Sequence, residues 1–291
     1  MRSHRNMASV KTIPADPGTI PAGPASPTVL PRQDEINRAV YNSPGVYRYY
    51  LSNLLMPAEI GCLLKYQPHI IQGDVLDIGV GAGRTARYLA PLARRYEGID
   101  YSSVMVGYMK QAMPEISVRQ ADFRDLTMFA DESFDFVLAT DNVIDALPHE
   151  GRISALGEAH RVLRRGGILA FSSHNINYKK AFAGPQLNWS SNPVRFAANC
   201  VNYLLSQWNH YRVVPWRTTT SEYALLNDPG HRYACLHYYA SRSTVRTQLA
   251  SIEFHLIEAF DIGGLVVPEA KDDSENQSLL YVAQRADLAP A

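Results

Sequence analysis

The sequence predicts an α/β fold with a mostly parallel, doubly wound sheet. Three observations support this prediction: short apolar segments alternate with segments of helical periodicity, the first apolar segment runs straight into a group of glycines, and a Gly-Gly turn introduces the fifth. Because parallel strands need crossover connections, strands that alternate with helices favour one sheet with helices on both faces.

The chain changes character near residue 34. Residues 1–33 are rich in Pro, Ala, Gly, Ser and Thr, so they offer little apolar surface to offset the entropy of ordering, and we expect a disordered tail. Residues 34–62 carry a helical and aromatic pattern, and we expect them to form short helices that act as an N-terminal helical lid.

The central part of the chain, residues 63–175, carries the alternation. Strands are predicted at 74–79, 96–100, 116–120, 134–139 and 167–173, and helices at 84–95, 103–111 and 154–163. This segment is therefore predicted to form the core of the fold.

The end of the chain returns to the same pattern. Residues 241–291 contain a predicted helix at 243–250 and an antiparallel pair of strands at 253–260 and 278–284. Residues 176–240 are too many for a plain connection, so we interpret them as an inserted cap. The cap holds all three tryptophans and two strand candidates, 218–225 and 233–240, around an Asn-Asp-Pro-Gly turn.

Composition narrows the kinds of partner. The 28 Lys and Arg residues balance the 28 Asp and Glu residues, so the chain lacks the positive charge that binding to nucleic acid or to an anionic membrane requires. Cys62, Cys200 and Cys235 show no metal-ligand spacing, so we expect no metal site and a reducing cytoplasm. No apolar run reaches the roughly 18 to 20 residues that span a bilayer. A cytoplasmic protein with a small-molecule partner is expected.

A glycine-rich turn follows the first predicted strand. Gly79, Gly81 and Gly83 allow the backbone to turn tightly and to approach a ligand without a Cβ in between. A dinucleotide-binding turn would place its third glycine at position 84, where Arg84 stands, and Asp77 precedes the first glycine by two residues. This arrangement disfavours NAD as the ligand, and a simple tight turn is the alternative.

Over roughly residues 70 to 175 the chain resembles the class I S-adenosylmethionine-dependent methyltransferases. Their first motif, an apolar strand followed by an acidic residue and GxGxG, is matched by Leu76-Asp-Ile-Gly-Val-Gly-Ala-Gly83. Four further motifs are matched in order, by Asp100, by Asp122-Phe123, by 134–142 and by 161–168. The resemblance implies a Rossmann-like sheet of seven strands and S-adenosyl-L-methionine as the cofactor.

The same resemblance implies a set of cofactor-binding residues. Asp100 would accept both ribose hydroxyls in charge-assisted hydrogen bonds, and Asp122 would meet the adenine amino group. Asp77 would order the glycine turn or receive the ammonium group. The remaining members are Tyr101, Phe123, Arg84, Asn142 and the three glycines. Each Asp taken alone is also consistent with a helix cap or a solvated turn.

The carboxyl ends of the fourth and fifth strands hold the candidate catalytic residues. Ligands of open α/β sheets lie beyond these ends, which places Asp141, Asp145 and His174 near the transferred methyl group. His174 is the candidate general base because imidazole exchanges protons near neutral pH, and capping of the strand is its alternative role. Asp141 and Asp145 are candidates for orienting the acceptor or holding the ammonium group, although Asp145 is equally consistent with a helix cap.

The methyl acceptor is expected to meet residues of the lid, the fifth strand and the cap. The candidates are Tyr49, Asn175, His231, His237 and Tyr238. The cap aromatics either line a substrate pocket or form a small core of their own, and exposed aromatic faces would also suit a homodimer. The Asn-Asp-Pro turn followed by a tyrosine pair resembles bacterial methyltransferases that modify natural products.

Together these features predict transfer of a methyl group from S-adenosylmethionine to an oxygen or nitrogen atom of a small metabolite, in secondary metabolism. Two alternatives stay open: an NAD(P)-dependent oxidoreductase, which Arg84 disfavours, and a protein that binds the cofactor without turnover. A nucleic-acid methyltransferase is disfavoured by the balanced charge and by Thr140-Asp-Asn-Val143, which stands where base methyltransferases carry Asn-Pro-Pro-Tyr or Asp-Pro-Pro-Tyr.

Overall fold

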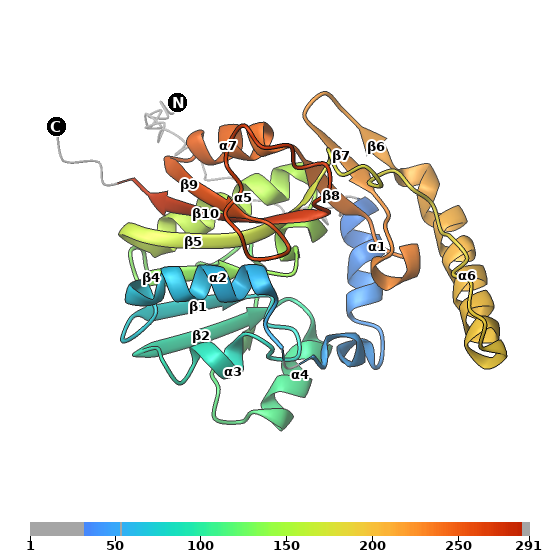
Figure 1. The fold of residues 1–291 in the computed structure, drawn as a ribbon. Helices are drawn as coiled ribbons and strands as arrows, with labels where there is room; N and C mark the ends of the chain where they lie inside the picture. The colour runs from blue at the N-terminus through green and yellow to red at the C-terminus, as the bar shows by residue number, and fades with distance from the viewer. Residues whose placement is uncertain (1–31, 53, 287–291) are drawn as a thin grey trace, which may run out of the picture. The chain divides into compact units, whose positions relative to one another are not determined.

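A parallel sheet forms the centre of the computed structural model, which describes residues 32–52 and 54–286 (Figure 1). The predicted tail lies almost wholly outside this range. The five parallel strands are β1 (Asp74–Ile78), β2 (Arg95–Asp100), β3 (Val118–Gln120), β4 (Phe134–Ala139) and β5 (Leu163–Asn175). They lie in the order β3-β2-β1-β4-β5, so the carboxyl ends of β1 and β4 are neighbours at one edge of the sheet.

Two antiparallel strands complete the predicted sheet. These are β9 (Phe254–Phe260) and β10 (Ser278–Arg285), and β10 lies between β5 and β9. The seven strands therefore follow the order β3-β2-β1-β4-β5-β10-β9. This arrangement confirms the predicted α/β class and its Rossmann-like, doubly wound architecture.

Three further strands, which belong to the predicted cap, extend this sheet to ten strands within the described residues. They are β6 (Thr218–Thr219), β7 (Tyr223–Leu226) and β8 (His237–Ala240). The pairing of β4 with β5 ends where Ala139 meets Phe171, so the last residues of β5 have a free edge beyond that point. β8 fills this edge in parallel, with Tyr239 opposite His174. The cap is thus continuous with the sheet.

Helices cover both faces of the sheet. On one face, α2 (Pro57–Lys65), α3 (Ala86–Leu89) and α4 (Ser103–Ala112) pack through apolar residues such as Cys62, Leu89 and Met109. On the other, α5 (His149–Val162) and α7 (Arg242–Ala250) pack through residues such as Leu156 and Leu249. None of the helices in residues 32–52 and 54–286 is both long and apolar enough to cross a lipid bilayer.

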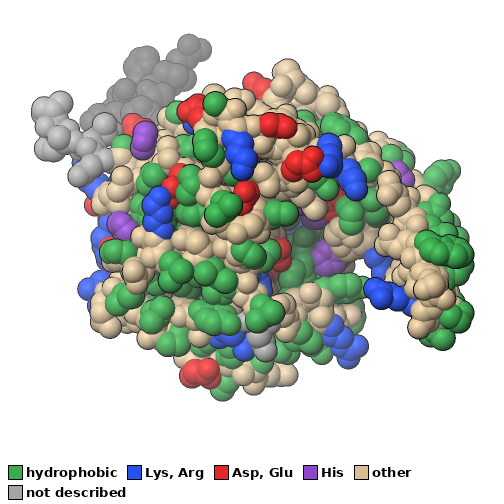
Figure 2. All heavy atoms as spheres, in the orientation of Figure 1, with side chains coloured by type: hydrophobic (Ala, Val, Ile, Leu, Met, Phe, Trp, Pro, Cys, Tyr) green, Lys and Arg blue, Asp and Glu red, His purple; other side chains and the backbone are tan. Residues whose placement is uncertain are grey.

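Two helices differ in length from their predictions. The helix expected at 84–95 comprises only Ala86–Leu89, because Pro91 has no backbone N–H to donate to the preceding turn. The helix expected at 154–163 begins earlier, at His149, directly after Pro148. The surface drawn in Figure 2 shows basic and acidic side chains interspersed, in keeping with the balanced composition.

The predicted N-terminal lid, residues 34–62, contains α1 (Arg32–Tyr41), the 3-10 helix η1 (Val46–Tyr50) and most of α2, but α2 packs against the sheet, so we keep the name lid for α1 and η1. Two buried amides attach α1 to the carboxyl edge of the sheet. The Gln33 Nε2 group donates to the carbonyls of Asp145 and Leu236, both at 3.1 Å, and the Asn37 Nδ2 group donates to those of Ala146 and Leu236. The lid is therefore held over the ends of the strands by its side chains.

The cap also contains a long helix that the sequence analysis missed, α6 (Pro193–Val213). Its start carries a recognisable signal, because the Asn192 side chain accepts a hydrogen bond from the Arg195 N–H and Pro193 occupies the first helical position. α6 lies at the side of the sheet and contacts the 3-10 helix η5 (Gly230–Tyr233) (Figure 1).

Candidate active site

The glycines of the turn after β1 allow close packing on one side and leave space on the other. Gly79, Gly81 and Gly83 all have positive φ angles, of 71°, 53° and 83°. A Cβ on Gly79 would lie 2.2 Å from Val143, and one on Gly83 would lie 2.1 Å from Met113, so these two glycines permit close packing. A Cβ on Gly81 would point toward Tyr50 at 3.8 Å instead. Gly81 therefore leaves space for a ligand.

A cavity lies over this turn. Its walls include the glycine turn, the ends of β2 and β4, and two rings of the lid, Tyr41 and Tyr50. Of the predicted residues, Arg84, Asp100, Tyr101 and Asp141 also line it, as do the first two glycines of the motif, Gly79 and Gly81. The buried Tyr101 hydroxyl has no hydrogen-bond partner, which leaves a polar group ready for a ligand.

Asp100 is fixed at the end of β2 by backbone donors. Its Oδ2 accepts from the Gly81 N–H at 3.0 Å and its Oδ1 from the Ser102 N–H at 2.8 Å. Burial raises the pKa of Asp100 to about 6, although both hydrogen bonds lower it. Each oxygen keeps a lone pair for a further donor, so the carboxylate is suited to a pair of hydroxyl groups.

Asp77 lies beneath the glycine turn. It accepts hydrogen bonds from the hydroxyls of Thr85 at 2.6 Å and Tyr96 at 2.8 Å. Burial raises the pKa of Asp77 to about 6. These contacts support the predicted role of ordering the turn. Nearby, Arg84 forms an ion pair with the buried Glu59 of α2 while it lines the cavity.

Asp122 and Phe123 lie apart from the cavity. The Asp122 carboxylate binds Arg124 at 2.7 Å and Arg38 at 2.5 Å. Burial alone would raise the pKa of Asp122, but these bonds hold it at about 2. Phe123 is buried in the main apolar core. Contact between adenine and Asp122 therefore requires Arg38 to release that carboxylate.

His174, near the end of β5, and Asp145, in the 3-10 helix η3 (Val143–Ala146) that follows β4, form a buried pair. Asp145 Oδ2 lies 2.8 Å from His174 Nδ1 and accepts the His174 backbone N–H at 2.6 Å. Its Oδ1 binds the Ser173 hydroxyl at 2.7 Å and Arg152 at 2.6 Å. Asp145 therefore orients the imidazole with Nε2 on the opposite side of the ring, although His174 is buried and does not line the glycine-turn cavity. The Asn142 amide lies 3.3 Å from that Nε2, and its own buried Oδ1 has no partner.

A second carboxylate connects His174 to the cap. Asp228 Oδ2 lies 3.4 Å from His174 Nε2, 2.7 Å from His237 Nδ1 and 2.9 Å from the Tyr239 hydroxyl. Burial alone would raise the pKa of Asp228 and lower that of His237. Their mutual attraction outweighs burial, so the pKa of Asp228 falls well below and that of His237 rises well above the usual range. On its other side, His237 Nε2 lies 3.3 Å from the Tyr41 hydroxyl.

The same cluster offers one ligand atom each from His174, Asp228 and His237, all within 4.8 Å of one another. The expectation of no metal site was based on the spacing of the three cysteines. The three residues of this cluster are far apart in the sequence, and only the fold brings them together. In the structure the Asp228 carboxylate and the His237 imidazole bind each other directly through a hydrogen bond of 2.7 Å.

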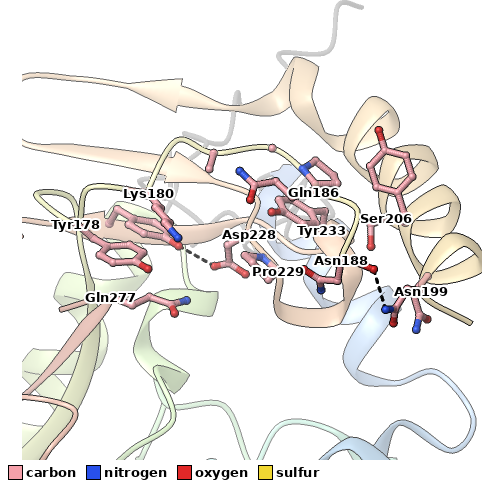
Figure 3. Close-up of a pocket in the computed structure, with 17 residues that line it drawn as sticks. Tyr178, Lys180, Gln186, Asn188, Asn199, Ser206, Asp228, Pro229, Tyr233 and Gln277 are labelled. Carbon is pink, nitrogen blue, oxygen red and sulfur yellow. Dashed lines mark hydrogen bonds between the residues drawn. The ribbon is translucent and has the colours of Figure 1, made fainter. Parts of the chain in front are cut away.

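A second cavity opens on the far side of Asp228, between the loop at 178–188 and α6 (Figure 3). Its volume is about 330 Å³. Asp228 and Tyr239 belong to its lining, and Lys180 is its single cationic side chain among the described residues. The other lining side chains are mostly uncharged and polar, among them Tyr178, Gln186, Asn199, Tyr203, Ser206 and Gln277.

His231 lies under the lid. Its Nε2 is 2.6 Å from the Tyr50 hydroxyl, and its ring centroid is 4.9 Å from that of Tyr41 and 5.4 Å from that of Tyr49. Burial and the nearby His237 lower the pKa of His231 to about 4. Tyr49 itself is 61% exposed, whereas Tyr50 lines the first cavity. The inward-facing tyrosine of the pair is thus Tyr50.

Two predicted acceptor-binding residues lie elsewhere. The Tyr238 hydroxyl is bonded to Gln248 and to His149, both at 2.9 Å, within the apolar core. The Asn175 amide donates to the Asp273 carbonyl at 2.9 Å. Because successive strand residues face opposite sides, Tyr239 points to the second cavity in place of Tyr238. Because every second residue of a strand lies on the same face, the choice of His237 should have been accompanied by Tyr239 and not by Tyr238.

Tyr41 and Asp228 belong to the site but were not predicted from the sequence. Asp228 stands in the Asn-Asp-Pro turn, which was read only as a turn, and its side chain accepts the Gly230 N–H at 2.8 Å as such turns do. Its second oxygen makes the contacts with the histidines. Tyr41 gave no signal beyond an aromatic residue at the end of a short helix.

The Asp145–Arg152 ion pair is fully buried, which yields a prediction about stability. Replacing Arg152 with Met should lower the free energy of unfolding by about 3–5 kcal/mol, because the Asp145 charge loses its partner. Chemical denaturation measures this change. The control is Arg94→Met, whose side chain is 59% exposed where it binds Asp74, and a much smaller effect is expected. An equal loss of unfolding free energy in both variants would contradict the assignment of a stabilising buried ion pair to Asp145 and Arg152.

Part of the chain is similar to known proteins. Residues 75–167 match the family described as methyltransferase domain. A probable S-adenosylmethionine-dependent methyltransferase from Mycolicibacterium smegmatis is 33% identical over 102 residues, which cover 35% of this chain and 38% of the relative. The chain thus matches well under half the length of such curated relatives.

Solved structures share the fold over most of the chain. The CcbJ methyltransferase from Streptomyces caelestis has a TM-score of 0.55 at 16% identity and covers 86% of this chain and 99% of its own. The 1,6-didemethyltoxoflavin-N1-methyltransferase from Burkholderia thailandensis was solved with bound 1,6-didemethyltoxoflavin and S-adenosylhomocysteine. It has a TM-score of 0.53 at 12% identity, and the match covers 91% of this chain and 95% of its own.

The fold is that of solved S-adenosylmethionine-dependent methyltransferases, and the glycine-turn cavity lies where their first motif predicts it. Residues 75–167 are the part that matches the methyltransferase family. These matches support the predicted enzyme class and S-adenosyl-L-methionine as the cofactor for this part of the chain.

Proposed function

We propose that the whole protein transfers a methyl group from S-adenosylmethionine to an oxygen or nitrogen atom of a small polar molecule, in secondary metabolism. One observation carries this proposal: the cluster of His174, Asp228 and His237 lies between two cavities. Tyr41 lines the first cavity and contacts His237, while Asp228 lines the second and contacts both histidines. The first cavity suits the cofactor and the second suits an acceptor.

The residues of the first cavity fit S-adenosylmethionine. The space beside Gly81 accommodates the methionine moiety, Asp100 accepts the ribose hydroxyls, and the unpartnered Tyr101 hydroxyl offers a polar contact near the adenine. The cavity is narrow, about 70 Å³, whereas ligand sites are typically about 300–1,000 Å³. Tyr41 and Tyr50 of the lid therefore move outward when the cofactor enters.

The cluster can remove a proton from the acceptor. S-adenosylmethionine supplies a methyl group on its sulfonium sulfur; the acceptor's oxygen or nitrogen forms the new bond as the sulfur–methyl bond breaks, leaving S-adenosylhomocysteine. His174 lines neither cavity, so the acceptor has to reach past Asp228 before His174 Nε2 takes its proton. Asp145 then stabilises the resulting imidazolium through Nδ1. Asn142, 3.3 Å from Nε2, would orient an acceptor that reaches this nitrogen. Asp145 acts as a positioning residue because it is fully buried.

The second cavity indicates the kind of acceptor. Its lining combines amide side chains with tyrosine hydroxyls, so it suits an uncharged molecule that carries several hydroxyl or amide groups. The likeness to the 1,6-didemethyltoxoflavin-N1-methyltransferase supports a small-molecule acceptor at the level of the fold. Balanced charge argues against a nucleic acid.

Calorimetric titration with S-adenosylmethionine, S-adenosylhomocysteine and NADH tests the proposal. Micromolar binding of the first two and none of NADH is expected, followed by methyl transfer to a member of a panel of hydroxyl- and amide-rich metabolites. Binding of none of the three would show that the glycine turn is structural. Binding of the first two without transfer to any panel member would favour a protein that holds the cofactor without turnover.

Cofactor affinity should depend on pH because Asp100 must be ionised to accept two hydroxyls. With a pKa of about 6, its protonation should weaken affinity about tenfold between pH 8 and pH 5. The contribution of Asp77 and Asp100 to the stability of the unliganded protein should show the opposite trend. Folding raises the pKa of Asp77 and Asp100, so the stability that they contribute is greatest below about pH 4 and is lost as the pH rises through about 6. Cofactor titrations between pH 5 and pH 8 check the predicted change in affinity. Thermal melts over the same range and down to about pH 4 check the predicted change in stability.

A further inference from the structure

The outer side of α6 carries an apolar repeat. Apolar residues recur at the spacing of a heptad, alternately three and four residues apart, and every one of them is exposed. We call this set the α6 seam: Val194, Ala197, Val201, Leu204, Trp208 and Tyr211. Trp208 is 63% exposed and Tyr211 is 77% exposed. A repeat of this period is typical of a helix that packs along a second helix.

The inner side of α6 is polar. Asn199, Tyr203 and Ser206 face the second cavity, and the helix contacts η5 on that side (Figure 3). In the space-filling view, hydrophobic side chains gather along the outer edge formed by α6 (Figure 2). A surface helix normally turns its apolar face toward its own core. The reversed arrangement in α6 indicates a partner outside this chain.

We infer that two copies of this chain associate through the α6 seam as an antiparallel pair of helices. The seam contains no charged or strongly polar side chain, so its burial leaves no unpaired charge. Within residues 32–52 and 54–286 the chain itself leaves the seam uncovered, as the exposure of its members shows.

The sizes of the seam residues favour an antiparallel pair of identical helices. The first half of the seam is small and the second half is large. In an antiparallel pair with Val201 opposite the partner's Leu204, the same register sets Ala197 opposite the partner's Trp208. It also sets Val194 opposite the partner's Tyr211. Each pair then joins a small side chain to a large one, whereas a parallel pair would set Trp208 against the partner's Trp208.

The area of the seam matches that of a stable dimer. With exposed aromatic side chains of about 150–200 Å² each, the seam offers on the order of 700 Å² per chain, close to the roughly 800 Å² per partner of standard interfaces. A membrane surface suits it less well, because helices that lie on membranes are rich in Lys and Arg on their polar face. In α6 only Arg195 and Arg212 carry such charges, and the inner face carries amides and hydroxyls.

Sedimentation velocity of the full chain at tens of micromolar tests this association. The wild type should be a dimer, and Leu204→Glu, at a position that is 65% exposed and therefore tolerant of change, should be a monomer. The matched control is Asn202→Glu, which places the same charge on an exposed position outside the seam and should leave the dimer intact. A monomeric wild type would overturn the inference. So would binding of the monomer to phosphatidylcholine–phosphatidylglycerol vesicles in place of self-association.

Cross-linking tests the direction of the helices. In a Cys200→Ser background, where Cys62 and Cys235 are buried, Val194→Cys and Tyr211→Cys are combined in one chain and treated with a short bismaleimide. The two positions lie about 25 Å apart within one helix, so only the antiparallel partner brings them together. The double variant should form covalent dimers and each single variant should not. Cross-linking of the single variants would indicate a parallel pair and contradict the proposed register.

Discussion

Replacing Asp100 with Ala is expected to weaken S-adenosylmethionine binding about 100-fold or more. Hydrogen bonds to a charged group contribute about 1.5–3 kcal/mol each, and two ribose hydroxyls would lose their acceptor. The variant also frees the Gly81 N–H, which Asp100 binds at 3.0 Å, so the glycine turn loses an anchor. Calorimetric titration of the wild type and the variant measures the change.

Asp100→Asn is the matched control. It keeps the size of the side chain and one carbonyl oxygen, which can still hold one of the two backbone N–H groups, but it removes the charge. An affinity between those of the wild type and Asp100→Ala is expected, with a weaker dependence on pH. A residual dependence would come from Asp77, whose pKa is also about 6. Unchanged affinity in Asp100→Ala would exclude the ribose assignment.

His174→Ala is expected to lower the turnover number by about 10²–10⁴, the usual contribution of a general base. Cofactor affinity should stay close to that of the wild type, because His174 contacts Asp145 and Asp228 and lies outside the lining of the glycine-turn cavity. Steady-state kinetics with saturating acceptor, together with cofactor titration, separates the two quantities.

Two further measurements distinguish the roles of this cluster. Asp145→Asn should lower turnover and displace the pH profile, since it keeps the shape of the side chain but weakens its hold on His174 Nδ1. Wild-type turnover in His174→Ala would remove His174 from the catalytic residues. Loss of activity on dialysis against a chelator, with recovery on addition of a divalent cation, would instead assign His174, Asp228 and His237 to a cation site.

Local sequence determined the central strands, the glycine turn and the placement of Asp100. Each depends on a short segment: apolar runs form the strands, positive φ angles demand glycine at 79, 81 and 83, and Asp100 follows directly on its strand. The order of the motifs along the chain then indicated the fold and the cofactor, because parallel strands bring their carboxyl ends to one edge.

The tertiary structure alone decided the partners of the candidate catalytic groups. Asp145 could have capped a helix or bound an acceptor, but the fold buries it against Arg152 and His174. Asp228 and His237 reach His174 only because β8 adds to the free end of β5. Such contacts join segments far apart in the chain, so no local pattern contains them. The exposed face of α6 was hidden from the sequence for the same reason, since an apolar stripe predicts burial and only the fold shows which side of the helix is already covered.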